Sequence, residues 1–306
     1  MRIVISGASS FIGMRLVYKA SEQGWKVVAV IRDSSIQRKV LNNVRGVSVC
    51  TCDMENYSDL GPIVGESDCF VHLSWDGTRG NARLDDQKQY KNYKQSLDAI
   101  KSMIDSGCKR IVTAGSQAEY GLSNEIITED TPCNPNTAYG KYKVKLFEKA
   151  YALCEKNKIS FKEPRYFSLY GPGDYENTMI MSCIENMLKN EPCKLTQAIQ
   201  MWDYLYIDDA INALMYLCGK SCADGAYNFG SGDCRPLRDY IEELKQILNS
   251  NSKLLYGAIP YSDAGMVSIH PSIKKLVNET GWSPKVNFEE GIKQVLKFRQ
   301  YANRLQ

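Results

Sequence analysis

The sequence predicts an α/β fold: a doubly wound parallel sheet with helices on both faces, joined to a smaller second lobe. Three observations support this. Short apolar runs alternate with amphipathic segments through the first half of the chain, a glycine turn directly follows the first run, and the alternation breaks after residue 167. Strands that alternate with helices favour a parallel sheet. Right-handed crossovers place the carboxyl ends of such strands at one edge, where ligands bind.

The first half of the chain supplies most of the expected elements. The run RIVISG predicts the first strand, and the apolar spacing after it predicts a helix that ends on Gly24. Two further long helices are expected over residues 84–106 and 139–156. The remaining strands are expected at KVVAVIR (26–32), GVSVCTCD (46–53), DCFVHLSW (68–75), KRIVTAGS (109–116) and ISFKEPRYF (159–167).

The second half is less regular. A Gly/Pro-rich loop at 168–179 precedes a helix near 180–190, and residues 204–219 return to a strand followed by a helix. A C-terminal helix is expected near 288–301. We therefore expect a second lobe that is built from discontinuous segments of the chain.

Composition excludes several classes of protein. The 306 residues carry a net charge of only +3 with 43% hydrophobic residues, so neither a nucleic-acid groove nor a polybasic membrane patch is expected. No apolar run approaches the length of a membrane span, and no signal peptide fits the N-terminus. The two histidines, His72 and His270, leave a zinc site without its usual ligands, and no metal is expected. Eleven cysteines in a long chain indicate a reducing compartment, so we expect a cytoplasmic protein.

The turn after the first strand reads GASSFIG and predicts a dinucleotide site. Gly7 permits a tight turn, and Gly13 lets the helix pack close to the strand. The start of the helix offers backbone N–H groups to a pyrophosphate. Ser10 stands where a third glycine is usual, and its hydroxyl could add a donor. The residues expected at the cofactor are Gly7, Ser9, Ser10, Phe11, Ile12 and Gly13.

The ends of the second and third strands bear on the choice of cofactor. Arg32 ends the second strand, where an acid would bind a ribose 2′-hydroxyl and an arginine suits a 2′-phosphate. NADP(H) is therefore favoured, with NAD(H) possible; otherwise Arg32 is a solvated surface residue. Asp53, followed by Met54, could reach the adenine, or Asp53 could instead cap the helix after it.

The segment YGKYK holds Tyr139 and Lys143, four residues apart on one face of a predicted helix. A tyrosine has an ordinary pKa of about 10, and a nearby ammonium lowers it by stabilising the phenolate. Such a tyrosine can exchange a proton with a sugar hydroxyl or a ketone while hydride moves to or from nicotinamide.

Two other pairs, Tyr90/Lys94 and Tyr216/Lys220, have the same spacing. Position distinguishes them, because only Tyr139/Lys143 follows the strand that leads into the loop at Ser116. We therefore take Ser116, Tyr139 and Lys143 as the candidate catalytic residues and the other two pairs as surface or packing residues.

An ordered series of motifs gives the chain a family resemblance. It resembles the extended short-chain dehydrogenase/reductase family of nucleotide-sugar epimerases, dehydratases and reductases, whose fold is a Rossmann doubly wound sheet. The match runs almost end to end, through GASSFIG, CDMEN, FVHLSW, GSQAEYG, YGKYKVKLFE, PRYFSLYGPG, YLYIDDAINA, YNFGSG and TGWSPKVNFEEGI.

The resemblance implies roles for the candidate residues. Ser116 would hydrogen-bond the substrate oxygen, Tyr139 would donate or accept the proton, and Lys143 would hold the nicotinamide ribose and tune Tyr139. Further residues are expected to line the cofactor: Leu73, Ser74 and Tyr166, with Arg165 beside them. On the substrate side we expect Trp75, Arg79, Gln117, Asn177 and Trp202. Asn92 would support the site, and His72 is expected only to pack.

The resemblance also divides the chain into two functional parts. Residues 1–167 plus about 203–228 would form the dinucleotide-binding Rossmann domain, and about 168–202 plus 229–306 the substrate-binding lobe. The two long helices, about 84–106 and 137–157, would pair with their twins in a homodimer. Trp202 departs from the family pattern, because an arginine often stands there and clamps a phosphate, which an indole cannot do.

The residues after Ser116 bear on the reaction. In sugar 4,6-dehydratases an Asp-Glu pair follows the catalytic hydroxyl residue, whereas Gln117 and Ala118 stand here, so loss of water is not expected. Glu119 is expected to point elsewhere on an extended segment. We favour an NADPH-dependent reductase of a 4-keto, often 6-deoxy, nucleotide sugar. A 4-epimerase with tightly bound NAD is the alternative, and a non-catalytic dinucleotide-sensing regulator is a third, less favoured hypothesis.

Overall fold

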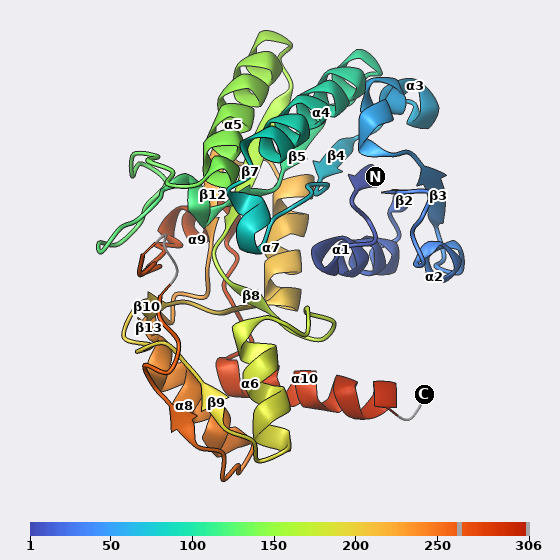
Figure 1. The fold of residues 1–306 in the computed structure, drawn as a ribbon. Helices are drawn as coiled ribbons and strands as arrows, with labels where there is room; N and C mark the ends of the chain where they lie inside the picture. Colours follow the sequence, from blue (N-terminus) through green and yellow to red (C-terminus); the bar gives the residue numbers. More distant parts are fainter. Residues whose placement is uncertain (262–264, 304–306) are drawn as a thin grey trace.

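The computed structural model of the chain describes residues 1–261 and 265–303 (Figure 1). Its centre is a parallel sheet in which seven strands follow the order β12-β7-β5-β4-β1-β2-β3. This order reverses between β1 and β4, and ligands bind in open sheets at such a reversal. The strands are β1 (Arg2–Ser6), β2 (Lys26–Ile31), β3 (Val47–Thr51), β4 (Cys69–His72), β5 (Arg110–Thr113), β7 (Ser160–Tyr166) and β12 (Gly225–Phe229); an eighth, β6 (Gly115–Ser116), pairs with β7.

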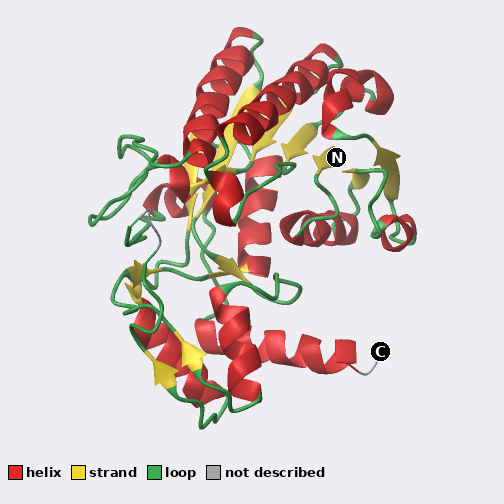
Figure 2. Cartoon of the chain, in the orientation of Figure 1, coloured by secondary structure: helices red, strands yellow, loops and turns green. Residues whose placement is uncertain are grey.

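Helices cover both faces of this sheet (Figure 2). Alternate residues of one strand serve opposite faces: Ile3 and Ile5 join one buried cluster, whereas Val4 joins the other. The first cluster includes residues of α1 (Phe11–Glu22) and α7 (Ile207–Gly219), and α9 (Lys274–Thr280) contacts α7 and β12. The second cluster includes residues of α3 (Leu60–Val64), α4 (Asp86–Asp105) and α5 (Ala138–Lys156). The predicted doubly wound fold is confirmed.

The smaller lobe lies below the sheet in Figure 1 and is made of short strand pairs and three helices. Outside the main sheet, short strands pair as β8 (Leu169–Tyr170) with β11 (Leu205–Tyr206), β9 (Cys193–Lys194) with β14 (Leu254–Leu255), and β10 (Met201–Trp202) with β13 (Arg235–Pro236). The helices are α6 (Met179–Leu188), α8 (Leu237–Ile247) and α10 (Phe288–Asn303). Rings of Tyr170, Tyr204, Tyr240 and Phe288 pack against one another at its centre.

Some elements were not expected from the sequence. The strand β12 adds to the sheet beside β7, and its five residues are buried. Short helical segments, α2 (Arg38–Asn42) and the 3₁₀ segment η1 (Met54–Asp59) with α3, follow β2 and β3. These segments are too short to show a helical period, because a period of 3.6 residues needs several turns to be recognised.

The described residues contain neither a candidate membrane span nor a candidate metal cluster. No helix within 1–261 and 265–303 is both long and apolar enough to cross a membrane. Across the same residues, no group of three or more His, Cys, Asp or Glu side chains is placed to hold a metal ion.

Candidate active site

Two adjoining cavities lie at the carboxyl edge of the sheet. The smaller, about 220 Å³, lies over the turn after β1 and reaches Arg32. The larger, about 570 Å³, extends from Ser116 to the residues around α6 in the lobe. Both are lined by Ser10, Leu73, Trp75 and Tyr175, so they meet along one wall. Their combined extent suits a dinucleotide beside a second ligand.

The turn after β1 has no room for a side chain at either of its glycines. Gly7 has a φ of +68°, and a Cβ there would lie 2.9 Å from the backbone of Leu73 and Ser74. A Cβ on Gly13 would lie 2.2 Å from the carbonyl oxygen of Gly7. The two roles predicted for these glycines are therefore confirmed: one permits the turn and the other permits α1 to pack against it.

Ser10 has a structural reason to replace the expected middle glycine. It is the N-cap of α1, with extended backbone dihedrals that any residue adopts, and its Oγ accepts a hydrogen bond from the N–H of Gly13 at 3.1 Å. The hydroxyl keeps its own proton and can still donate it. Because α1 has no acid in its first turn, its positive end is left for an anion.

Two arginines follow β2: Arg38 forms an ion pair, whereas Arg32 forms none within the described residues. Arg32 lines the smaller cavity with Met54. Arg38 donates from Nη2 to Oδ1 of Asp33 and to Oγ1 of Thr51, each at 2.8 Å. The acid that directly follows Arg32 is thus already occupied. No carboxylate pairs with Arg32 in the part of the chain that the structure describes.

Asp53 does not line either cavity. Its Oδ1 lies 3.4 Å from the backbone N–H of Asp33, and although it occupies the N-cap position of η1, its side chain makes no capping bond. The side chain of Asp53 therefore does not cap η1, and its contact with an adenine stays a prediction.

The three candidate catalytic residues meet at the larger cavity. Ser116 ends β6, and Tyr139 and Lys143 lie one turn apart near the start of α5; all three line the cavity. The N-cap of α5, Thr137, accepts a bond from Gly140 N–H and fixes where the helix begins. Lys143 Nζ donates to the carbonyl oxygen of Ala114 at 2.6 Å and lies 3.9 Å from the centre of the Trp75 indole. Tyr90/Lys94 and Tyr216/Lys220 do not line the cavity.

The pKa of Tyr139 differs from the expectation. Burial raises the pKa of Tyr139, and a hydrogen bond with Ser116 and the positive charge of Arg83 act against that rise. Lys143 is not among these influences: its Nζ lies 5.8 Å from the ring centre and is bonded to Ala114. Burial also lowers the pKa of Lys143 to about 8. The tuning of Tyr139 by Lys143 therefore stays a prediction.

The segment after Ser116 is not extended, which corrects the reasoning about Glu119. Residues Gln117–Glu119 form a 3₁₀ turn, η3, with Ser116 as its N-cap. Oε1 of Glu119 accepts from the N–H of Ser116 at 2.7 Å, and Oγ of Ser116 accepts from the N–H of Ala118 at 3.2 Å. Glu119 is fully buried beneath Ser116 and holds its backbone in place.

Beneath the site lies a buried ionic cluster. Nε of Arg165 lies 2.9 Å from Oε2 of Glu119 and 3.2 Å from Oε1 of Glu163, and all three residues are at most 3% exposed. Burial and the charge of Glu119 raise the pKa of Glu163 well above its ordinary value. Arg165 does not line the larger cavity, although Tyr166 does. The expectation that Arg165 forms the wall near the nicotinamide is wrong, because the guanidinium of Arg165 is buried and pairs with Glu119 and Glu163.

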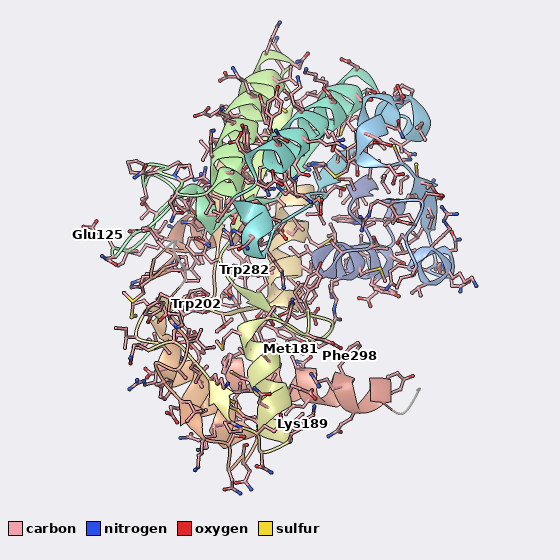
Figure 3. The ribbon with its side chains drawn as sticks, viewed as in Figure 1. Glu125, Met181, Lys189, Trp202, Trp282 and Phe298 are labelled. Carbon is pink, nitrogen blue, oxygen red and sulfur yellow. The ribbon has the colours of Figure 1, made fainter. Side chains whose placement is uncertain are left out.

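The expected substrate-side residues lie at the larger cavity. Gln117 lines it on the sheet side, and Asn177 and Trp202 line it on the lobe side. Trp202 lies where the lobe meets the half that contains the sheet (Figure 3). Arg79 also lines the cavity, but Nη2 of Arg79 lies 3.7 Å from Oδ1 of the buried Asp174.

Residues on and after β4 hold the wall that both cavities share. His72 is buried and bonded to Ser6 and Ser96 through its two ring nitrogens, each at 2.8 Å, and burial lowers the pKa of His72 to about 3. The packing role expected for His72 is what the structure shows. Asn92 accepts from the N–H of Asp76 and donates to its carbonyl, so it fixes the loop after Trp75.

Sequence reasoning missed Arg83 and Tyr175, which line these cavities. Neither belongs to a periodic segment or a motif. Arg83 ends a short 3₁₀ segment, η2 (Gly80–Arg83), before α4, and Tyr175 lies within the Gly/Pro-rich loop at 168–179. The only available signal was their place in loops at the carboxyl edge of the sheet.

Comparisons with known proteins agree with this geometry. The model of the NAD dependent epimerase/dehydratase family matches residues 3–230. CDP-abequose synthase of Salmonella muenchen is 25% identical over 310 residues, which cover 98% of each chain. The dTDP-4-dehydro-6-deoxyglucose reductase of Escherichia coli is 25% identical over 219 residues, 69% of this chain and 68% of its own.

Similarity in three dimensions extends over the whole chain. UDP-glucuronic acid 4-epimerase from Bacillus cereus, solved in complex with UDP-glucuronic acid and NAD, superposes with a TM-score of 0.85. The match covers 99% of this chain and 100% of that one at 19% identity, so it shows a shared fold.

Proposed function

Because the chain belongs to the NAD dependent epimerase/dehydratase family, within the extended short-chain dehydrogenases/reductases, and is a nucleotide-sugar oxidoreductase or epimerase, we propose that it reduces the 4-keto group of a nucleotide sugar. The sugar is a 6-deoxy sugar in this proposal, and NADPH is the preferred cofactor. The main support for this proposal is that Ser116, Tyr139 and Lys143 all line one cavity. The two residues after Ser116 are Gln117 and Ala118, and neither is an acid.

The chain's own residues have distinct tasks in this reaction. A bound reduced nicotinamide dinucleotide supplies the hydride to the ketone carbon. Tyr139 donates its phenolic proton to the ketone oxygen, and Ser116 donates a hydrogen bond to that same oxygen and polarises the carbonyl. The hydroxyl of Ser116 can do so because its oxygen accepts from Ala118 while its proton stays available. Lys143 holds the cofactor ribose.

The lobe is proposed to hold the nucleotide sugar. Asn177 and the first residues of α6 line the larger cavity, and α6 has no acid in its first turn, which suits a diphosphate at its N-terminus. Trp202 offers an aromatic face to a base or a sugar. In this proposal residues 1–167 and about 203–228 bind the dinucleotide, and about 168–202 and 229–306 bind the substrate.

A reaction with a defined substrate tests the proposal. Purified protein is incubated with a dTDP- or CDP-linked 4-keto-6-deoxy sugar and NADPH, and the nicotinamide absorbance is followed. We expect stoichiometric oxidation of NADPH with formation of a 4-hydroxy sugar. A protein purified with NAD that equilibrates a 4-hydroxyl without any external reductant would instead support the alternative, a nucleotide-sugar 4-epimerase.

Preference for NADPH over NADH is proposed from Arg32. Its guanidinium lines the smaller cavity beside Ser9 and Ser10, and the neighbouring acid, Asp33, is already paired with Arg38. A 2′-phosphate would therefore meet a free cation, whereas a 2′-hydroxyl would find its usual acidic partner already engaged.

Arg32→Gln is expected to raise the KM for NADPH roughly tenfold or more, because a charged hydrogen bond to phosphate is lost, with little change for NADH. Steady-state kinetics with both cofactors measures this. Arg45→Gln serves as the control for a general loss of positive charge, since Arg45 is exposed and lines neither cavity. An unchanged NADPH/NADH ratio in Arg32→Gln would reject the role of Arg32.

Two further properties are part of the proposal. Pairing of α4 and α5 with their twins would form a homodimer, and sedimentation equilibrium that shows only monomer would reject it. The eleven cysteines are all free, which suits a reducing compartment such as the cytoplasm.

A further inference from the structure

Arg83 lies on a segment that is firmly held to α4. Gln89 is fully buried, and its Nε2 donates to the carbonyls of Gly77 at 2.9 Å and Ala82 at 2.8 Å. Oε1 of the same side chain accepts from the indole N–H of Trp75 at 2.6 Å. One glutamine thus ties the backbone next to Arg83 to the wall of the cavity, so the position of Arg83 is set by buried bonds.

The two arginines of this segment differ in charge compensation. Arg79 is 3.7 Å from the carboxylate of Asp174, and its guanidinium lies 4.0 Å from the centre of the Tyr175 ring. Arg83 has no ion pair within residues 1–261 and 265–303. Its buried Nε also lacks a hydrogen-bond partner there. Arg83 therefore brings an uncompensated positive charge to the larger cavity.

That charge faces Tyr139. The Arg83 guanidinium carbon lies 4.9 Å from the centre of the Tyr139 ring. The other charges that act near this ring are Lys143 on α5, Glu119 on η3 and Glu163 on β7. Glu119 and Glu163 are engaged with Arg165, and Lys143 is bonded to Ala114. Of the two cations, Arg83 lies nearer to the ring centre, at 4.9 Å against 5.8 Å for Lys143 Nζ.

We propose that Arg83 is a positioning residue of the reaction: its guanidinium, held against the ring of Tyr139, stabilises the negative charge that stays on the Tyr139 oxygen when its proton leaves. The proposal rests on the proposed function, in which Tyr139 is the proton donor. In that step the O–H bond of Tyr139 breaks and a new O–H bond forms on the former ketone oxygen, whose carbon takes up the hydride pair from NADPH. A cation 4–6 Å from a developing anion favours the charged form.

Arg83→Gln tests this in two independent ways. In protein labelled with [¹³Cζ]tyrosine, with the Tyr139 signal assigned by comparison with Tyr139→Phe, the pKa of Tyr139 is expected to rise by about one pH unit or more. In ketone reduction, kcat is expected to fall up to about tenfold with little change in the KM for the sugar. In the pH profile of kcat, activity falls at alkaline pH where Tyr139 loses its proton. This alkaline limb should move to higher pH by the same amount as the pKa.

Two variants separate charge from structure. Arg83→Lys keeps the charge and is expected to retain most of the wild-type Tyr139 pKa. Arg79→Gln removes a neutralised charge from the same segment and should leave that pKa unchanged. An unchanged Tyr139 titration in Arg83→Gln overturns the proposal, and if the KM for the sugar rises instead, Arg83 is a substrate-binding residue. Because the titration needs no substrate, a failed reductase assay with a shifted Tyr139 pKa would reject the reductase and keep the electrostatic coupling.

Discussion

Tyr139→Phe is expected to lower kcat/KM for ketone reduction by about 10²- to 10⁴-fold, because it removes the phenolic hydroxyl that supplies the proton. The ring remains, so its edge-to-face contact with Trp75, 6.0 Å between ring centres, and its contact with Arg83 are retained. NADPH affinity should therefore change little. Steady-state kinetics gives the loss of activity, and titration of cofactor fluorescence gives the affinity.

The chain offers a matched control. Tyr216 has a lysine four residues later, as Tyr139 does, and Lys220 Nζ lies 4.1 Å from the centre of the Tyr216 ring. Tyr216→Phe should keep full activity, because neither residue lines the cavity. If Tyr139→Phe kept its activity in the cell and still bound the cofactor, the protein would be a dinucleotide-sensing regulator and the catalytic proposal would be wrong.

Arg165→Met is expected to destabilise the protein by about 3–5 kcal/mol at neutral pH, the usual result of removing one partner from a buried ionic group. It leaves Glu119 and Glu163 buried close together without the cation that now lies between them. Urea denaturation followed by circular dichroism measures the change in the free energy of unfolding.

The loss should depend on pH with a definite sign. Without Arg165 the pKa of Glu163, which is already raised in the folded protein, rises further above its unfolded value, so the folded state binds more protons in the window above about pH 4. Stability of Arg165→Met should therefore recover as the pH falls from 7 towards 5. A variant whose stability falls further on acidification would contradict this account.

A second substitution tests the cause. Glu163→Gln removes one of the two carboxylates, so the double variant Glu163→Gln/Arg165→Met should be more stable than the sum of the two single changes predicts. Strict additivity would mean that the cluster is not one coupled unit. Cofactor affinity of the soluble fraction serves as the control for correct folding.

The cluster also explains why Ser116 is well placed. Glu119 makes two contacts: one carboxylate oxygen accepts a hydrogen bond from the backbone N–H of Ser116, and the other forms an ion pair with Arg165. An aliphatic residue at this position would leave that N–H without its partner inside the protein. The geometry of the candidate hydroxyl thus depends on charges that do not touch the cavity.

Local sequence was enough for much of the fold and for the candidate catalytic residues. Gly7 and Gly13 can be predicted from the sequence because the turn after β1 and the close packing of α1 require glycines within a few residues of that strand. Tyr139 and Lys143 share a face because one helix fixes their spacing. The periodicity of apolar residues predicts the order of strands and helices. Right-handed crossovers then place the carboxyl ends of β1 and β5 at the same edge of the sheet.

Only the tertiary structure shows which residues from distant parts of the chain contact one another. Glu119, Glu163 and Arg165 come together because β6 lies beside β7, and no local pattern records that neighbour. Arg83 faces Tyr139 because buried bonds to Gln89 hold the loop before α4. A side chain's pKa depends on burial and on charges within several ångströms, whatever their separation in sequence. The sequence by itself therefore identified the candidate reacting groups, and the packed structure decided which charges act on them.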